Sequence, residues 1–222
     1  GVQTCALPIY ELARAQKRRQ RGIGVGAKGT ILHRQADQWA VEGAALTGQE
    51  LTGVWVGKDL VFAVGRGGRV ARKQAGRWAL ERVMDNGSSL TSDLMAVWGS
   101  GAGDAAVVYA AGADGVILRR DSSGWVREAS GATTVLLTTV FGRSAAEVYV
   151  GGARGTLLRR GAAGAWIADN VPRLSGRTFV SGSLAADGGY LVASGGILLR
   201  RNGAAWELDT ASLTNQELSA VT

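Results

Sequence analysis

The side chains of this sequence that could do acid–base chemistry are its carboxylates. The chain has 222 residues, of which 18 are aspartate or glutamate. A pair of carboxylates, one protonated and one ionised, is what most glycoside hydrolases use. Most of these carboxylates, however, recur at fixed places in a repeated segment. Because a catalytic centre needs different groups that converge on one point, such recurrence indicates a structural use.

Fourteen of the 18 carboxylates follow the repeat. They stand three residues after a tryptophan, before the second of the four short strands expected in each copy, before the leucine that starts the first of these strands, or in a short polar loop. The four that do not follow it are Glu11, Asp85, Asp114 and Glu207. No two of these stand out as the acid and base of a glycosidase.

The sequence has few residues that could form a metal site, act as a nucleophile or build an aromatic site. His33, the only histidine, occupies the position that Arg119 and its equivalents hold in other copies, and a zinc site needs several histidines or cysteines. The only cysteine, Cys5, lies in residues 1–9 (GVQTCALPI), which resemble the translation of a common sequencing adapter and are excluded from the fold. Tyr109 shares its repeat position with other aromatic residues, so we expect it to pack. We predict no catalytic residue, metal or cofactor.

The elements that would position these residues form one unit that recurs five times. Each copy has an apolar run, a glycine turn (Gly-x-x-Gly in four copies, with Ala193 in place of the first glycine in the last), a second apolar run that ends in a basic pair, a polar loop, and a tryptophan followed by an acid. The copies are about 40 to 47 residues apart, as expected for one supersecondary unit per repeat. The landmarks are the second glycines and the tryptophans: Gly29, Gly68, Gly115, Gly155, Gly196, Trp39, Trp78, Trp125, Trp166 and Trp206.

Each copy predicts four short strands. In the third copy these are residues 94–99, 106–111, 116–120 and 125–128, which are rich in β-branched and aromatic residues and bounded by Gly, Asp and Ser. Four antiparallel strands every 40-odd residues are typical of a β-propeller blade. The sequence therefore predicts an all-β propeller with about five blades, in which the repeated glycines make tight turns at positive φ.

The expected blades are residues 22–49, 50–92, 93–135, 136–175 and 176–213, with the first strand of another blade in 214–222. We expect residues 10–21 to be a basic, poorly ordered stub; the alternative is an inner strand of the first blade. Two assemblies fit this pattern. One is a closed five-blade ring, and the other is a fragment of a ring of roughly six to eight blades. The adapter-like residues favour the fragment.

Charge and hydropathy limit the classes of partner. The formal net charge is +7, but residues 10–21 contribute +4 of it, so we expect no nucleic-acid partner. No apolar run approaches the roughly 18 residues of a membrane span. The basic pairs, such as Arg119–Arg120, suggest a cross-strand ladder with the tryptophans and acids of the same sheet. The alternative is a basic rim for an acidic partner.

We expect a ligand to bind where side chains differ between copies while the turns and connections that carry them recur. In a propeller the Gly-x-x-Gly turns and the connections from the fourth strand to the next first strand lie on one face. Residues there vary between copies, and we predict that this face binds the partner. The candidates are Lys28, Arg66, Asp114 and Arg154 in the turns, with Asp85, Asn86, Arg173 and Arg177 in or beside the connections.

Several segments resemble bacterial propeller repeats of the BNR or Asp-box type, and the related YVTN-like and photosystem II assembly-factor-like repeats. These segments are residues 29–39 (GTILHRQADQW), 115–125 (GVILRRDSSGW), 130–142 and 94–112. Only Asp37 and Asp121 stand in the Asp-box loop. The resemblance implies a non-catalytic module that binds a protein or polysaccharide outside the cytoplasm. The alternatives are a fragment of an Asp-box glycosidase and an assembly scaffold for a membrane complex.

Overall fold

The computed structural model describes residues 12–18, 21–35, 38–42, 46–131, 134–172, 174–209 and 216–221. These residues form five four-stranded antiparallel sheets, each with its strands in chain order. The first sheet contains β1 (Leu12–Arg18), β2 (Arg21–Gly26), β3 (Ile31–Gln35) and β4 (Gln38–Val41). The second contains β5 (Leu51–Val56), β6 (Leu60–Gly65), β7 (Arg69–Gln74) and β8 (Arg77–Glu81).

The other three sheets repeat this plan. The third contains β11 (Leu94–Ser100), β12 (Val107–Gly112), β13 (Ile117–Asp121) and β14 (Gly124–Glu128). The fourth contains β15 (Leu137–Ser144), β16 (Glu147–Gly152), β17 (Leu157–Arg160) and β18 (Trp166–Ala168). The fifth contains β19 (Phe179–Ala185), β20 (Gly188–Ala193), β21 (Ile197–Asn202) and β22 (Ala205–Leu208).

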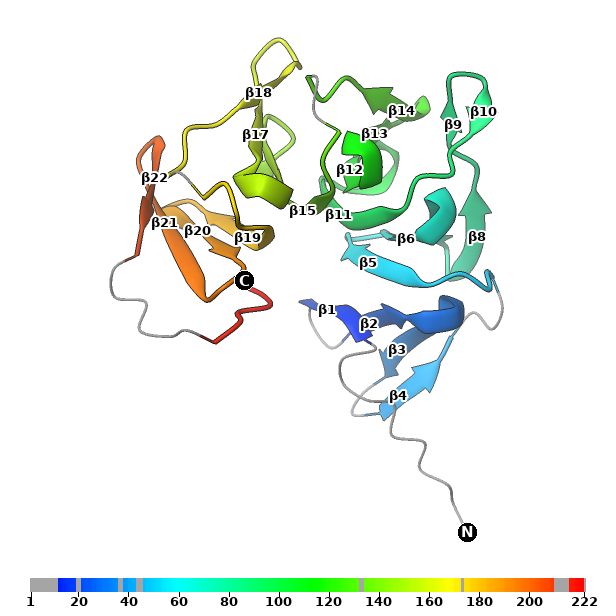
Figure 1. Cartoon of the computed structure of the whole chain (residues 1–222). Coiled ribbons are helices and arrows are strands. Elements are labelled where there is room, and N and C mark those ends of the chain that lie inside the picture. Colours follow the sequence, from blue (N-terminus) through cyan, green and yellow to red (C-terminus); the bar gives the residue numbers. More distant parts are fainter. Residues whose placement is uncertain are drawn as a thin grey trace.

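The five sheets are arranged as the blades of a propeller, as the sequence predicts. The first strands of successive sheets are neighbours, from β1 to β5, β11, β15 and β19, so they line the centre. Figure 1 shows the sheets fanned about that centre, with an open side between the first sheet and the last. No described helix is long and apolar enough to cross a membrane.

The hydrophobic core is divided into four clusters, one between each pair of successive sheets. For example, Phe62 and Val70 of the second sheet share a cluster with Val108 and Leu118 of the third. The other three clusters join the first sheet to the second, the third to the fourth, and the fourth to the fifth. Each sheet is therefore stabilised mainly by its neighbours, because a single sheet cannot bury its own apolar faces.

Two boundaries differ from the sequence prediction. Residues 12–18 form β1, which pairs with β2 from Leu12↔Gly26 to Arg18↔Arg21, so the expected stub is wrong over this range and the inner-strand alternative is right. Strands pair through backbone hydrogen bonds, which need no apolar stripe, so periodicity did not reveal this strand. Residues 216–221 lie outside any assigned strand, although Val221 exchanges hydrogen bonds with Ser181 of β19 (3.1 and 3.4 Å).

A carboxylate of one sheet binds two side chains of the next sheet, and this arrangement, here called the clasp, recurs along the chain. Glu81 accepts hydrogen bonds from Trp125 Nε1 (2.7 Å) and Arg120 Nε (3.3 Å) of the third sheet. Glu128 accepts the same pair from Trp166 and Arg160 of the fourth.

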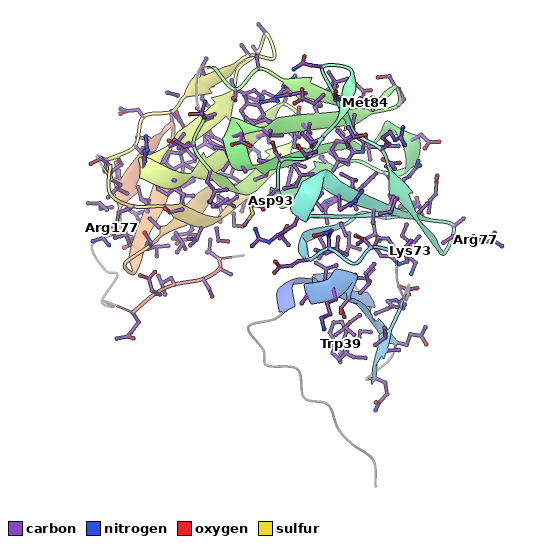
Figure 2. All side chains as sticks on the ribbon, turned by 45° about the vertical axis from the view of Figure 1, so that its right-hand side comes forward. Trp39, Lys73, Arg77, Met84, Asp93 and Arg177 are labelled. Atoms are coloured by element: carbon purple, nitrogen blue, oxygen red, sulfur yellow. The ribbon has the colours of Figure 1, made fainter. Side chains whose placement is uncertain are left out.

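The first and last interfaces contain variants of the clasp. Glu42 accepts from Lys73 and from Trp78 Nε1 of the second sheet, and Lys73 lies between those two sheets (Figure 2). At the last interface Asp169 accepts from Trp206 Nε1 (3.3 Å), while Arg201 binds Glu147 instead. The part of the clasp common to all four interfaces is thus an indole N–H that donates to a carboxylate of the preceding sheet.

The expected ladder within one sheet accounts for only part of these contacts. Arg120 lies opposite Trp125 in the register of β13 and β14, as predicted, and Arg119 Nε is 3.9 Å from Glu128 Oε1 in the same sheet. The shorter contacts of Glu128, however, go to the next sheet. The sequence interpretation missed this because it paired each acid and each tryptophan with the basic residues of their own copy.

We predict that Glu81→Gln lowers the free energy of unfolding by about 1–3 kcal/mol, as for a lost hydrogen bond to a charged group. Arg120 is only 7% exposed, so it would lose its charged partner in a site with little water. The control is Glu50→Gln, which removes an exposed ion pair to Arg66 and should cost no more than about 1 kcal/mol. Equal losses in urea denaturation would contradict the special role of the clasp.

Acid should destabilise these interfaces. The hydrogen bond from Arg201 holds the pKa of Glu147 below its ordinary value of 4.5. Burial would raise the pKa of Glu42, but the bonds from Lys73 and Trp78 outweigh it and lower the pKa. A pKa that is lower in the folded state gives stability at neutral pH that is lost as the pH falls through 4.5 toward the folded pKa. Denaturation at several pH values should show this loss, and it should be smaller in a Glu42→Gln/Glu147→Gln variant; an unchanged pH dependence in that variant would contradict the assignment.

Candidate binding face

The turns between the second and third strands present side chains from an unusual backbone conformation. They are short 3-10 segments: η2 (Ala27–Gly29), η3 (Arg66–Gly68), η5 (Ala113–Gly115) and η6 (Ala153–Gly155). Lys28, Asp114 and Arg154 occupy the same place in their turns, with φ of 53°, 57° and 59°. All three side chains are exposed. The positive φ at this place is therefore not confined to glycine.

The connections from the fourth strand to the next first strand pass over these turns. Gly115 N donates to Val135 O (3.1 Å) and Gly155 N donates to Arg177 O (2.7 Å). In the second sheet, a Cβ on Gly68 would lie 2.3 Å from Leu90 O. The turns and the covering connections thus form one surface, here called the turn face, as the sequence predicts. The repeated second glycine is needed for this close approach as well as for its φ.

Arg66 lies on the turn face but is held there by two carboxylates. It stands one residue earlier in its turn than Lys28 does, and Gly67 takes the place of Lys28. Its guanidinium binds Glu50 (2.9 Å) of its own sheet and Asp93 (2.7 Å) at the start of the third sheet. The N–H of Gly67 and then Arg66 lower the pKa of Asp93. Arg66 therefore links two sheets, and its single positive charge is offset by two carboxylates.

The remaining charges of the turn face are distributed unevenly. Asp114 accepts a hydrogen bond from Ser92 Oγ (2.9 Å) near the middle of the row of turns. Arg154 and Arg177 are both exposed, and the hydrogen bond from Gly155 to Arg177 brings their backbones together. The guanidinium of Arg177 lies over Gly195 in the turn of the fifth sheet. The part of the turn face between the fourth and fifth sheets is thus the one where two exposed arginines adjoin.

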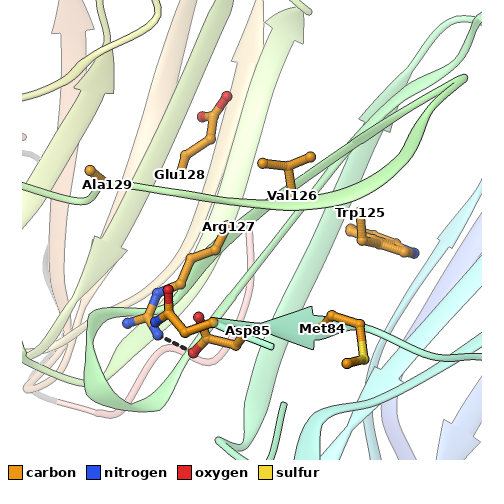
Figure 3. A pocket seen from close by; sticks show the side chains of 8 residues that line it. Met84, Asp85, Trp125, Val126, Arg127, Glu128 and Ala129 are labelled. Atoms are coloured by element: carbon orange, nitrogen blue, oxygen red, sulfur yellow. Dashed lines mark hydrogen bonds and ion pairs between the residues drawn. The ribbon is translucent and has the colours of Figure 1, made fainter. Parts of the chain in front are cut away.

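The predicted residues Asp85 and Asn86 do not lie over a turn. They belong to a hairpin of β9 (Met84–Asp85) and β10 (Ser88–Ser89). Strand β9 of this hairpin contacts β14, the outer strand of the third sheet. Asp85 forms an ion pair with Arg127 of β14, which Figure 3 shows reaching toward the hairpin. A pocket of about 450 Å³ lies there, lined by Met84, Asp85, Asn86, Trp125, Val126, Arg127, Glu128 and Ala129. The sequence missed this hairpin because it occurs in a single copy.

Other candidates from the sequence have structural positions or lie outside the described residues. Arg173 and Asp37 are outside them. His33 lies on β3 opposite Ile23 and Ala40. In the described part of the chain, no group of three or more His, Cys, Asp or Glu residues is placed to hold a metal ion.

Comparisons with known proteins give the fold. No protein-family model and no curated protein matches the chain. Among solved structures, it is similar to YCF48 bound to D1 peptide (14% identity, 94% of this chain and 85% of that one, TM-score 0.60). It is similar to the computationally designed protein Ika8 (14%, 96% and 65%, TM-score 0.69). It is also similar to a catalytically inactive virginiamycin B lyase from Staphylococcus aureus with quinupristin (12%, 96% and 75%, TM-score 0.76).

These likenesses support the β-propeller fold that the five sheets show. They do not single out the Asp-box type of repeat, and at such identities they assign no activity.

We predict that Gly68→Ala destabilises the protein more than Gly67→Ala does. Both glycines have positive φ (67° and 64°), but a Cβ on Gly67 meets nothing within 4 Å. Gly67→Ala should cost roughly 1–2 kcal/mol for the left-handed conformation alone. Gly68→Ala adds a contact with Leu90 O that only a backbone shift can relieve. Equal losses in urea denaturation would show that the connection does not press on the turn.

Proposed function

We propose that this chain is a non-enzymatic binding module whose turn face holds an acidic segment of a protein partner. The observation that carries the proposal is the pair of exposed arginines, Arg154 and Arg177, on a frame that is otherwise constant between copies. Guanidinium groups bind carboxylates strongly and often in a bidentate way. An extended acidic segment could therefore lie across the turns of the fourth and fifth sheets.

The use made of the repeated polar residues supports a module without catalysis. The acids that follow the tryptophans bind side chains of the next sheet. In the Asp-box loop, Asp121 accepts from the N–H and the hydroxyl of Ser123 (2.9 and 2.6 Å) and forms an ion pair with Arg119. The bonds from Ser123, and to a smaller extent Arg119, lower the pKa of Asp121. These contacts favour a structural role for the Asp-box-like loop over the glycosidase alternative. The acids described here are already bound to other side chains and do not form the pair of carboxylates that a glycosidase needs.

An assembly scaffold is a second candidate, in which the acidic segment belongs to a membrane protein. The observation that favours it is the structural similarity to YCF48 bound to D1 peptide. Both candidates use a peptide-sized segment on one propeller face. The two candidates differ in the protein that supplies the segment. A preference for one acidic sequence over another would distinguish either candidate from general attraction to negative charge.

The test compares two double charge reversals. Arg154→Glu/Arg177→Glu changes the turn face, while Arg77→Glu/Arg82→Glu makes the same change at two exposed residues, one on β8 and one just after it. Arg77 lies at the outer end of the second sheet (Figure 2). Binding of a fluorescent poly-glutamate peptide should weaken about tenfold or more in the first variant, since each lost charge pair is worth roughly 1 kcal/mol. The control variant should weaken it far less.

Three results would count against the proposal. The poly-glutamate peptide does not bind, both variants lose the same affinity, or a poly-lysine peptide binds as well as poly-glutamate. Equal losses would mean that the net charge of +7, and no particular face, attracts the peptide.

A further inference from the structure

The pocket beside the β9–β10 hairpin lies where the chain departs from its own repeat. Among the described residues, no other connection between sheets forms such a hairpin. In four copies the residue two places after the tryptophan is apolar: Val41, Leu80, Ala168 and Leu208. The third copy has Arg127 there instead, and Arg127 forms an ion pair with Asp85 of the hairpin. Two departures from the repeat thus meet in one contact, and both line the pocket.

The tryptophan of the third sheet is more open than those of the next two sheets. Trp166 and Trp206 make the same bond to a carboxylate of the preceding sheet and are 5% and 3% exposed. Trp125 is only half-buried, although its Nε1 donates to Glu81 (2.7 Å) and its ring packs edge to face with Phe62. The rest of this ring therefore contributes to the wall of the pocket.

Three kinds of side chain that bind aromatic rings converge on this pocket. An indole packs against other rings, a methionine thioether makes favourable contacts with them, and a guanidinium is attracted to their faces. Trp125, Met84 and Arg127 supply these groups, and Met84 is 45% exposed. In Figure 3, Met84 lies below the Trp125 ring. The ion pair with Asp85, to the left in the same view, holds the guanidinium at the pocket wall.

The spacing along β14 suits a flat group. Trp125 and Arg127 are two residues apart on this strand, so their side chains leave the same face of the sheet from points about 6.6 Å apart. A ring held between two flat groups needs about 3.5 Å on each of its sides. The pocket has a volume of about 450 Å³, within the range of roughly 300–1,000 Å³ for pockets that bind small organic ligands.

The charged groups of the pocket are already matched. Asp85 and Arg127 bind each other, and Glu128 accepts hydrogen bonds from Arg160 and Trp166 of the fourth sheet. A charged ligand would have to lose water without gaining an unmatched opposite charge, which is unfavourable. In this respect the pocket differs from the pair of exposed arginines on the turn face. It favours an uncharged ligand.

We propose that this pocket binds an uncharged aromatic ring system about the size of an indole, at a site separate from the turn face. The ring lies between Trp125 and Arg127 and contacts Met84. Asn86 lines the same pocket and is exposed, so its amide can form a hydrogen bond with a polar substituent of the ring. The ring belongs either to a free small molecule or to an aromatic side chain of a protein partner, because both present the same chemistry.

The methionine methyl groups allow a direct test, because the chain has only two methionines. Met84 lines the pocket, whereas Met95 lies on β11 at the centre of the propeller. A bound aromatic ring shifts the NMR signal of a methyl group that it touches. The whole chain, with isotope-labelled methionine methyl groups, is titrated with indole, with N-acetyltryptophanamide and with cyclohexanol. The variant Met84→Leu assigns the two signals.

Indole should shift the Met84 signal until the site is saturated and leave the Met95 signal unchanged. Cyclohexanol, an uncharged ring that is not aromatic, should bind far more weakly. N-acetyltryptophanamide carries its ring on a capped backbone and separates the two sources of the ring. If it shifts Met84 as indole does, the pocket accepts a side chain of a protein; if only indole does so, the ligand is a free small molecule.

Two double variants test the wall of the pocket. Asp85→Ala/Arg127→Leu removes the ion pair without changing the net charge, and the leucine matches Leu80 and Leu208 in other copies. It should weaken the binding of indole about two- to fivefold, as for a lost cation–π contact at an exposed site. The control is Glu50→Ala/Arg66→Leu, which removes an exposed ion pair on the turn face. The control should bind indole as the unmodified chain does.

The proposal is wrong if millimolar indole moves neither methionine signal, or if it moves both alike. It is also wrong if cyclohexanol shifts Met84 with the same affinity as indole, since the pocket would then select apolar molecules in general. Unchanged affinity for indole in Asp85→Ala/Arg127→Leu, or an equal loss in the control variant, would likewise overturn it.

Discussion

The structure depends on a carboxylate shared between neighbouring sheets. Glu81 and Glu128 each accept an indole N–H and a guanidinium N–H from the sheet that follows. The same tryptophans pack on a ring of the preceding sheet, so one side chain joins the apolar and the polar parts of the interface. A buried tryptophan N–H needs an acceptor, and here the acceptor is a carboxylate of the preceding sheet, so the bond helps to align the two sheets. The repeated residues thus form the contacts between neighbouring sheets.

This rule separates the constant residues from the variable ones. In the second to fifth sheets, the tryptophan and the second residue of the basic pair each bind a carboxylate of the preceding sheet. The turn face is built on the same frame, but its exposed positions change from Lys28 to Asp114 to Arg154. A repeat protein can vary such positions without loss of packing, because no neighbouring sheet depends on them. The proposed binding site lies at these positions for that reason.

The repeat allowed much of the fold to be predicted. The strands expected at 94–99 and 106–111 correspond to β11 and β12, because leucine, β-branched and aromatic residues are concentrated there between clear turn signals. The polar β1 gave no such pattern, and the β9–β10 hairpin occurs once, so periodicity could not reveal either. For the site, sequence spacing located the turns and their covering connections. It could not show that Arg66 is paired or that Asp85 lies on β14, since both depend on which sheets are neighbours.

The central claim is that the repeated tryptophan and acid act together across an interface. A double-mutant cycle between Glu128 and Trp166 tests it most directly, with Glu128→Gln, Trp166→Phe and the double variant compared by urea denaturation. Trp166→Phe removes the indole N–H but keeps an aromatic ring. We expect a coupling free energy between Glu128 and Trp166 of about 1 kcal/mol or more, within the range for residues in direct contact. Losses that simply add would contradict it.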